Sequence, residues 1–325
     1  MKSLTFLFLS SLFPLHFSAG AEQAAAEPRT TEGSAIAPAQ GKLSKKPNIV
    51  ILFADDLGIT DLGCYGKEHG NTYHETPHID QLAQQGMLFT DAYAASPVCS
   101  PTRASILTGK YPARLRLTDF LPGQIQPQFK RVKTAQPEQQ FLPPKEVTFA
   151  QALKEGGYST WFFGKWHLGK GQPTDFGFEQ EFGAQQSESN RFYPFKKKQK
   201  NIGGAEGDTI TDVFTDKAAE LIGKRREQWD NGDKKPFLIY MSYYLVHMPI
   251  KAREEGIAHF EAKKKTKKVE KQEQTDSNDV MYKLLDEKIE VPLGLLRQKH
   301  IFIATPCYGG QIGEPYFRSM MKFAI

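Results

Sequence analysis

The chain is poor in cysteine, with only Cys64, Cys99 and Cys307 among 325 residues. Small exported domains that depend on disulfide bonds carry more cysteines, usually in even numbers, so a disulfide framework is excluded here. An odd count also leaves at least one thiol with another role. We expect Cys64 to be a small buried residue, and Cys99 to be the cysteine with a chemical function.

Apolar runs long enough for a comfortable membrane span are also lacking. The run from Leu4 to Phe17 follows Lys2, precedes the small residues at 18–21, and is shorter than the ~20 residues of a spanning helix. This layout predicts a cleaved secretory signal over residues 1–21, with a membrane anchor as the alternative. Residues 22–46 are rich in alanine, proline, glycine and charge and predict a disordered leader. We therefore expect a secreted or periplasmic protein with no stable membrane span after signal removal.

Motifs of nucleic-acid binding are absent, although the formal net charge is +5. The basic runs Lys196–Lys200 and Lys263–Lys268 are typical of solvated surface. Alternatively, they form a cationic rim that attracts a polyanion. Because no DNA-binding helix, zinc-finger or RNA-module motif accompanies them, we expect no nucleic-acid partner and favour another anionic polymer.

Short apolar runs alternate with helical patterns along the middle of the chain. With 39% hydrophobic residues, the chain can bury a sizeable core. The predicted strands cover residues 48–53, 87–93, 159–163 and 236–244, and the predicted helices cover 76–86, 100–109, 147–156 and 212–226. This alternation predicts an α/β fold with a mostly parallel sheet sandwiched by helices.

Polar side chains follow three of the predicted strands: Asp55 and Asp56, then Lys165 and His167, then His247. Ligands of parallel sheets bind beyond the carboxyl ends of the strands, so these residues are candidates for one site. Two adjacent carboxylates repel each other unless a cation or proton separates them, which favours a hard divalent metal. The alternatives are an acidic turn that caps a helix and, for His247, a structural role.

The segment Cys99-Ser100-Pro101-Thr102-Arg103 places a cysteine at the start of a predicted helix. Pro101 suits the first helical position, Ser100 can cap the free backbone donors, and Gly109 can end the helix. Backbone N–H groups and the helix dipole favour an anion here, either a thiolate or a bound oxyanion. Arg103 adds a permanent charge, so the segment predicts an anion site with a reactive residue at its mouth.

Cys-x-Pro-Thr-Arg resembles the signature of the sulfatase family, and four further segments resemble the same family in the same order. They are residues 47–58 (PNIVILFADDLG), Pro112 in TGKYPAR, residues 164–169 (GKWHLG) and residues 242–249 (SYYLVHMP). The resemblance runs from about Pro47 to Ile289. It implies an alkaline-phosphatase-like fold and the hydrolysis of sulfate esters, with a sulfated carbohydrate or an aryl sulfate as substrate.

The resemblance also implies a covalent modification and a metal. Cys99 would be oxidised to formylglycine by a formylglycine-generating enzyme, and its hydrated form would attack sulfur. Asp55 and Asp56, together with the modified Cys99, would bind one Ca²⁺.

The other family residues match side chains that contact the reacting groups. Arg103 matches the arginine that holds the diol, and His167 matches a histidine that contacts it. Lys165 matches a sulfate-binding lysine, and His247 matches a histidine that contacts the sulfate and assists the leaving group.

The chain departs from the family after residue 290. The family's Ser-Asp-Asn-Gly strand and a later sulfate-binding lysine do not appear, although residues 279–290 resemble the helix that precedes that strand. Asp230-Asn231-Gly232 is expected to be a turn instead. Residues 47–290 are thus expected to form an incomplete, truncated catalytic domain with an exposed apolar face and an unpaired sheet edge.

Residues 291–325 form an atypical tail that suggests an unrelated reading frame. From Lys299, its pattern predicts a fresh strand, a glycine turn and a helix. Two alternatives to an active sulfatase stay open: an inactive protein that at most binds sulfated glycans, and a phosphoester or phosphonate hydrolase of the same fold.

Overall fold

The computed structural model describes residues 46–65, 73–90, 92–123, 137–185, 192–195, 202–249, 251–266, 300–304 and 321–324. They belong to one compact unit, Lys45–Ile325. The predicted signal and leader up to residue 45 lie outside the described residues, as do Lys196–Lys200, the helix expected at 279–290, and Cys307. Within the described part of the chain, no helix combines the length and apolar character needed to cross a membrane.

The described strands form one seven-stranded sheet in the order β2-β7-β6-β1-β5-β3-β4. Five adjacent strands run parallel to one another: β6, β1, β5, β3 and β4. At the other end of the sheet, β7 runs antiparallel to β6, and β2 runs antiparallel to β7. The strand bounds are β1 Ile49–Phe53, β2 Met87–Leu88, β3 Ser159–Lys165, β4 Gln180–Gln185, β5 Phe237–Ser242, β6 His300–Ala304 and β7 Met321–Ala324. The predicted mostly parallel sheet is confirmed.

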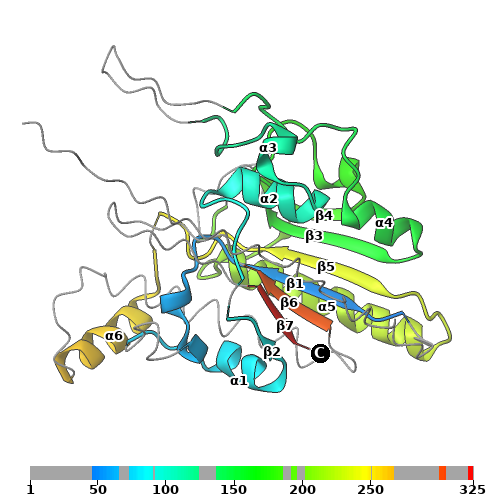
Figure 1. The fold of residues 1–325 in the computed structure, drawn as a ribbon. Coiled ribbons are helices and arrows are strands. Elements are labelled where there is room, and N and C mark those ends of the chain that lie inside the picture. The colour runs from blue at the N-terminus through cyan, green and yellow to red at the C-terminus, as the bar shows by residue number, and fades with distance from the viewer. Residues whose placement is uncertain are drawn as a thin grey trace, which may run out of the picture. The chain divides into compact units, whose positions relative to one another are not determined.

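Helices cover both faces of the sheet (Figure 1). Side chains of α1 (Pro77–Gln85) and α5 (Ile210–Asp230) pack on one face, and those of α2 (Cys99–Thr108), α3 (Pro112–Leu115) and α4 (Phe149–Glu155) pack on the other. The remaining helices are α6 (Glu254–Thr266) and 3₁₀ turns at Ile59–Asp61, Gly63–Tyr65 and Pro173–Phe176.

Alternating side chains of the central strands divide between the two cores. Phe163 and Met241 join the core under α5, whereas Phe162 and Tyr240 join the core under α2 and α4. Successive residues of a strand point to opposite faces, so a strand covered on both sides must be apolar throughout. All residues of β3 and β5 are buried, which explains the apolar runs Trp161–Phe163 in β3 and Phe237–Met241 in β5.

Most predicted elements are found close to their expected bounds, with two differences in length. The predicted strand 87–93 is paired only at Met87 and Leu88. The predicted helix 212–226 extends over Ile210–Asp230, because Thr209 and Asp212 form a capping box at its start. The predicted turn after Asp230 is confirmed, since Asn231 ends the helix and Gly232 has φ 102°.

Three sequence interpretations of single residues are wrong. Ser100 does not cap α2: Val98 precedes the helix, and the Ser100 hydroxyl accepts the N–H of Leu121 at 3.1 Å. Cys64 is half-buried rather than buried. Lys263 of the second basic run is not simply solvated, because α6 docks through it: its Nζ donates to Glu75 Oε1 at 2.7 Å and also to the carbonyl of Tyr73.

The expectation that the sheet has no strand after Glu290 is also wrong. β6 pairs in parallel with the full length of β1, from Ile49–His300 to Phe53–Ala304. The apolar segment His300–Ala304 can therefore occupy the edge that was expected to be unpaired. The strand predicted from Lys299 is confirmed, but residues 321–324 form strand β7 where a helix was expected.

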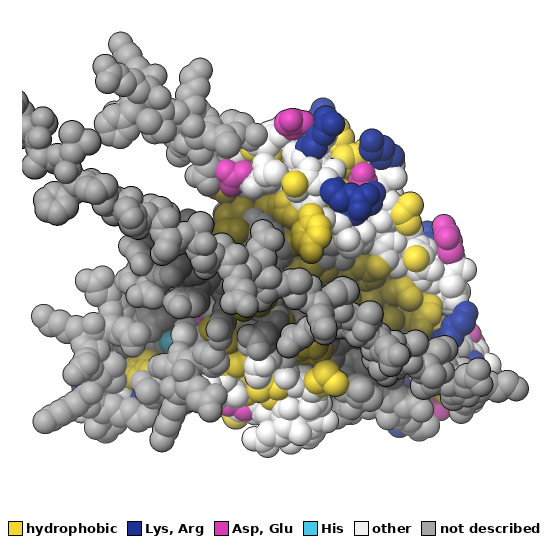
Figure 2. All heavy atoms as spheres, in the orientation of Figure 1, with side chains coloured by type: hydrophobic (Ala, Val, Ile, Leu, Met, Phe, Trp, Pro, Cys, Tyr) yellow, Lys and Arg dark blue, Asp and Glu magenta, His cyan; other side chains and the backbone are white. Residues whose placement is uncertain are grey.

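The apolar sheet face is less exposed than expected in the described strands. Side chains of β3 and β5 are buried, while Ile49 and Ile51 of β1 are half-buried on the α2–α4 side. Hydrophobic side chains gather in a band across the middle of the view in Figure 2.

Replacement of Phe162 by alanine tests the aromatic core under α4. Phe162 is 1% exposed, stacks on Tyr240 at 5.5 Å and meets Trp166 edge-on at 5.5 Å. We expect Phe162→Ala to lower the free energy of unfolding by about 3–5 kcal/mol, measured by urea denaturation. The control Val147→Ala removes an apolar side chain that is 66% exposed and should change it by no more than about 0.5 kcal/mol. Equal losses in the two variants would contradict this packing.

Candidate active site

The ends of β1 and β5 are joined by backbone hydrogen bonds that hold Asp55 at the carboxyl edge of the sheet. The N–H of Asp55 donates to the carbonyl of Leu245 at 2.7 Å, and the N–H of Val246 donates to the carbonyl of Asp55 at 2.7 Å. These reciprocal bonds keep the segments after both strands side by side. They bring His247 next to Asp55, as the strand-end argument predicts.

The Asp55 carboxylate is fully buried between two cations. Lys165 Nζ lies 2.5 Å from Oδ2 and Arg103 Nη2 lies 2.9 Å from Oδ1, and both cationic side chains are 3% exposed or less. Burial alone would raise the pKa of Asp55, but Lys165 and Arg103 outweigh it and hold the pKa well below its usual range. Asp55 is therefore ionised, and the three side chains form a buried ion triad.

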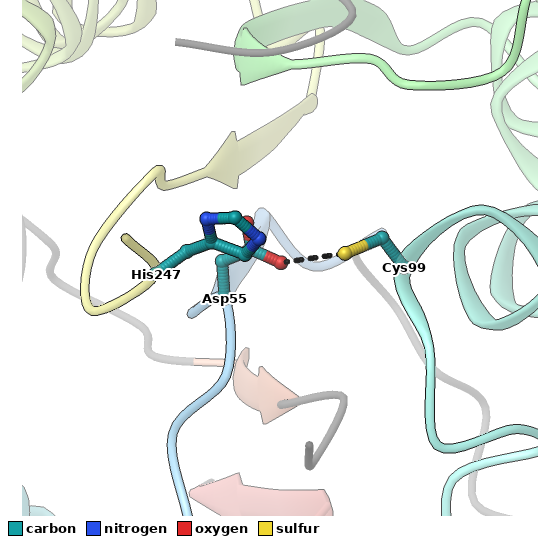
Figure 3. Close-up of side chains that lie close together, drawn as sticks. All are labelled: Asp55, Cys99 and His247. Atoms are coloured by element: carbon teal, nitrogen blue, oxygen red, sulfur yellow. Dashed lines mark hydrogen bonds between the residues drawn. The ribbon is translucent and has the colours of Figure 1, made fainter. Parts of the chain in front are cut away.

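Cys99 lies beside this ion triad at the first residue of α2. Its Sγ is 3.6 Å from Asp55 Oδ1 (Figure 3). The same sulfur is 3.4 Å from Lys165 Nζ. Burial, assisted by the negative charge of Asp55, raises the pKa of the thiol to about 11. The thiolate that the sequence analysis allows at Cys99 is thus disfavoured. Burial and the charge of Asp55 raise the pKa of the thiol more than the charges of Lys165 and Arg103 lower it.

Arg103 links four elements of the fold. From α2, its Nη1 donates to the carbonyl of Lys165 on β3 at 2.9 Å and to Ser242 Oγ at the end of β5 at 2.5 Å. Its guanidinium carbon also lies 4.9 Å from the ring centroid of Phe53 on β1. Such a buried guanidinium fixes the start of α2 relative to three strand ends.

Ser242 is a positioning residue that the sequence analysis does not single out. Its hydroxyl donates to the carbonyl of Lys165 at 2.7 Å while it accepts from Arg103. The sequence does contain a sign of this role, because Ser242 is the one polar residue at the end of the otherwise apolar strand FLIYMS.

Asp56 and His247 lie at the rim of the ion triad. Asp56 has φ 61°, and its Oδ2 is 3.5 Å from His247 Nε2. Burial and the neighbouring charge of Asp55 raise the pKa of Asp56 to about 6. His247 Nδ1 lies 2.6 Å from the carbonyl of Met248, so this nitrogen carries the proton when the ring is neutral.

His167 follows β3 with φ 50° and is not hydrogen-bonded to the other candidate residues. Its Nε2 lies 2.8 Å from the carbonyl of Leu121 and must donate, which leaves Nδ1 as the acceptor. Nδ1 is buried with no hydrogen-bond partner among the described residues. Burial, with a contribution from the charge of Lys165, lowers the pKa of His167 to about 4, so the ring is neutral.

The structure thus places Asp55, Cys99, Arg103 and Lys165 in direct contact. Ligand atoms of Asp55, Cys99 and His247 lie within 4.8 Å of one another, as Figure 3 shows for these side chains. Asp56 contacts this group through His247, and His167 interacts with it electrostatically, through the charges of Lys165, Arg103 and Asp55.

These residues fit a hard divalent cation through their carboxylates. Asp55 and Asp56 offer the oxygen ligands that Ca²⁺ prefers. Burial and the charge of Asp55 raise the pKa of Asp56, and a metal ion beside these carboxylates would stabilise their ionised forms. Because Lys165 and Arg103 already bind Asp55, a metal would share this carboxylate with them.

Solved structures with a similar fold show the fold class of the chain. The crystal structure of Ps i-CgsB gives a TM-score of 0.64 at 26% identity and covers 86% of this chain and 66% of that one. The PsFucS1 sulfatase from Pseudoalteromonas sp. gives 0.58 at 20% identity over 86% and 62%. The chain therefore has the alkaline-phosphatase-like α/β fold of these structures.

The family model named Sulfatase matches residues 47–313, and the chain belongs to the sulfatase family. The match includes β6 and runs past the point near Ile289 at which the resemblance was expected to end.

Two curated relatives are named for their enzymatic activities. An N-acetylgalactosamine-6-O-sulfatase from Bacteroides thetaiotaomicron is 37% identical over 212 residues, which are 61% of this chain and 37% of that protein. Human arylsulfatase A is 42% identical over 134 residues, 41% of this chain and 23% of that protein. The chain thus spans well under two thirds of the length of these relatives.

The low pKa of His167 gives a testable pH dependence. Because the native ring has a pKa of about 4 and an unfolded histidine about 6.5, the unfolded chain binds the proton first as the pH falls. The contribution of neutral His167 to stability is therefore complete above pH ~6.5 and is lost towards pH ~4.

We expect the His167 imidazole resonances to show no titration above pH ~5 in NMR. In His167→Gln, unfolding free energy should decline less steeply between pH ~6.5 and ~4 than in the original chain. A midpoint near the ordinary histidine value would contradict the neutral assignment.

Proposed function

We propose that this chain hydrolyses sulfate esters of sulfated carbohydrates and also accepts small aryl sulfates, with formylglycine made from Cys99 and one Ca²⁺ ion. The observation that carries the proposal is the position of Cys99 Sγ between Asp55 Oδ1 and Lys165 Nζ. Two similar proteins support the substrate class. One relative is an N-acetylgalactosamine-6-O-sulfatase. The other is Ps i-CgsB, which also has a crystal structure in complex with k-i-k-neocarrahexaose, with a TM-score of 0.64 at 25% identity.

The unmodified thiol is poorly suited to act as the nucleophile itself. With a pKa of about 11, Cys99 is protonated at neutral pH. Conversion of its side chain to a hydrated aldehyde would supply a hydroxyl nucleophile for sulfur, and Ca²⁺ held by Asp55, Asp56 and this residue would supply further positive charge. This explains how a buried, neutral cysteine can mark a catalytic position.

Lys165 and Arg103 have the charge and position to bind the sulfate group. Both are cations within the buried ion triad, and Lys165 Nζ lies 3.4 Å from the reacting position at Cys99. Fixed cations in a site with little water stabilise an oxyanion more strongly than they would in solution. We assign them to the sulfate oxygens and, for Arg103, also to the orientation of residue 99.

The two histidines lie in different surroundings: Nδ1 of His167 is buried, whereas the side chain of His247 is half-exposed. Neutral His167 presents Nδ1 as an acceptor, because this buried nitrogen has no hydrogen-bond partner among the described residues. His247 is half-exposed at the rim beside Asp56, where its ring is open to the oxygen of the leaving alcohol. We assign His247 to proton transfer to this oxygen and His167 to orientation of the nucleophile.

The proposal includes the cellular route of the protein. The N-terminal pattern of residues 1–21 supports export to the periplasm or beyond, and the Cys99 motif supports recognition by a formylglycine-generating enzyme.

Replacement of Cys99 by alanine tests the modified nucleophile. After co-expression with a formylglycine-generating enzyme, mass spectrometry of the peptide should show thiol-to-aldehyde conversion at Cys99. Because the nucleophile is lost, Cys99→Ala should lower kcat for 4-nitrocatechol sulfate on the order of 10³-fold or more. Cys64→Ala, at a cysteine outside the site, is the matched control and should keep kcat within about twofold.

The same assay separates the alternatives. Unchanged turnover in Cys99→Ala would overturn the role of Cys99. A chain that binds sulfated glycan without turnover would be the inactive alternative, and a preference for 4-nitrophenyl phosphate would identify a phosphoester hydrolase.

Calorimetric titration tests the metal ligands without any measurement of activity. We expect Ca²⁺ to bind the original chain, and Asp56→Asn to weaken binding about tenfold or more because one hard, charged ligand is lost. Asp216→Asn removes the same charge from an exposed position on α5 and should leave the isotherm unchanged. Identical isotherms for Asp56→Asn and the original chain would count against the assignment.

A further inference from the structure

A concave feature is lined by residues outside the ion triad, which follow β4 in the sequence. It is a pocket of about 270 Å³ lined by Tyr193, Pro194, Phe195, Gly203 and Gly204. Pockets that enclose drug-sized ligands start near ~300 Å³, so this pocket has room for about one ring of an oligomeric ligand. None of its residues belongs to the site described above.

The pocket is attached to the same edge of the sheet as Cys99. β4 runs parallel to β3, so the chain leaves β4 at the edge where β3 ends with Lys165. Phe192 then bridges Thr209, the residue that caps α5. The N–H of Tyr193 donates to the carbonyl of Asp208 at 3.0 Å, which fixes this segment against the start of α5.

Arg253 connects this region with the segment that follows His247. Its Nη2 donates to Asp212 Oδ2 in the first turn of α5 at 2.6 Å and to the carbonyl of Gly207 at 3.4 Å. His247 at the rim of the active site and Arg253 at the start of α5 are six positions apart in the sequence. The rim and the region of the pocket are therefore linked through a short stretch of sequence.

The lining residues provide an aromatic surface with an open side. Tyr193 is 43% exposed, and its ring meets the buried ring of Phe195 edge-on at 5.7 Å. This contact supports the Tyr193 ring from below. Gly203, which has φ 87°, and Gly204 contribute backbone without side chains to the lining, and a Cβ on Gly203 would meet nothing within 4 Å among the described residues.

We propose that this pocket binds one sugar ring of the sulfated carbohydrate, with the Tyr193 ring stacked on the apolar face of the sugar. The identity of the ligand rests on the proposed function, whereas the pocket itself is a feature of the described residues. Tyrosine suits this role because it offers a large, rigid apolar face with a polar edge. Tyr193 thereby selects for an oligosaccharide over an isolated sulfate ester.

The test measures binding by the full chain expressed without a formylglycine-generating enzyme, so that turnover does not interfere. The probe is a chondroitin-6-sulfate tetrasaccharide, titrated by calorimetry and examined by saturation-transfer NMR. We expect Tyr193→Ala to raise Kd about five- to tenfold, the effect of one lost aromatic contact. Tyr193→Phe keeps the ring and should bind within about twofold of the original chain.

Tyr111→Ala is the matched control, because Tyr111 is 74% exposed and precedes α3, away from this pocket. Thermal melting of each variant establishes that it is folded. Saturation transfer from the protein to the sugar ring should weaken in Tyr193→Ala and persist in Tyr193→Phe and Tyr111→Ala. Absence of tetrasaccharide binding by the original chain, an unchanged Kd in Tyr193→Ala, or an equal loss in Tyr193→Phe would each overturn the subsite.

Failure of the subsite is distinguishable from failure of the proposed function. Tyr193-dependent binding by a chain whose formylglycine form does not hydrolyse 4-nitrocatechol sulfate would support the subsite and refute the enzyme. Hydrolysis of that ester together with Tyr193-independent glycan binding would do the reverse.

Discussion

The buried carboxylate of Asp55 is the centre on which the rest of the site depends. Asp55 comes from the end of β1, Arg103 from α2 and Lys165 from β3, and all three side chains are 3% exposed or less. Removal of one partner from such an arrangement typically costs about 3–5 kcal/mol, because a buried charge is left uncompensated. The ion triad therefore ties two strands and a helix to one geometry.

This ion triad also sets the chemistry of its neighbours. Asp55 is held ionised by its two cations, and its charge then helps to raise the pKa of Cys99 and of Asp56. Lys165 in turn contributes to the low pKa of His167. Burial together with the charge of Asp55 thus leaves a protonated thiol at Cys99 and a rim carboxyl at Asp56 whose pKa is about 6. Burial together with the charge of Lys165 leaves His167 neutral.

The sheet supplies the rigid frame for this arrangement. β1 lies between β5 and β6, so its full length is hydrogen-bonded on both sides. Asp55 follows directly from a strand that cannot shift easily, and Ser242 at the end of β5 holds Arg103 in place. Contacts at three strand ends, rather than a flexible loop, fix the position of the first residue of α2.

The sequence by itself determined the alternation of strands and helices and the edge at which the candidate residues meet. Continuous apolar runs such as FLIYMS require burial on both faces, and the carboxyl ends of parallel strands lie at one edge. Motif order in the sequence also indicated the family. Only the tertiary structure decided the pairing of β6, because strand pairing joins residues about 250 positions apart and has no local signal. The tertiary structure also decided the protonation of Cys99. Local helix geometry favours a thiolate, but burial beside Asp55, which only the folded chain shows, reverses that preference.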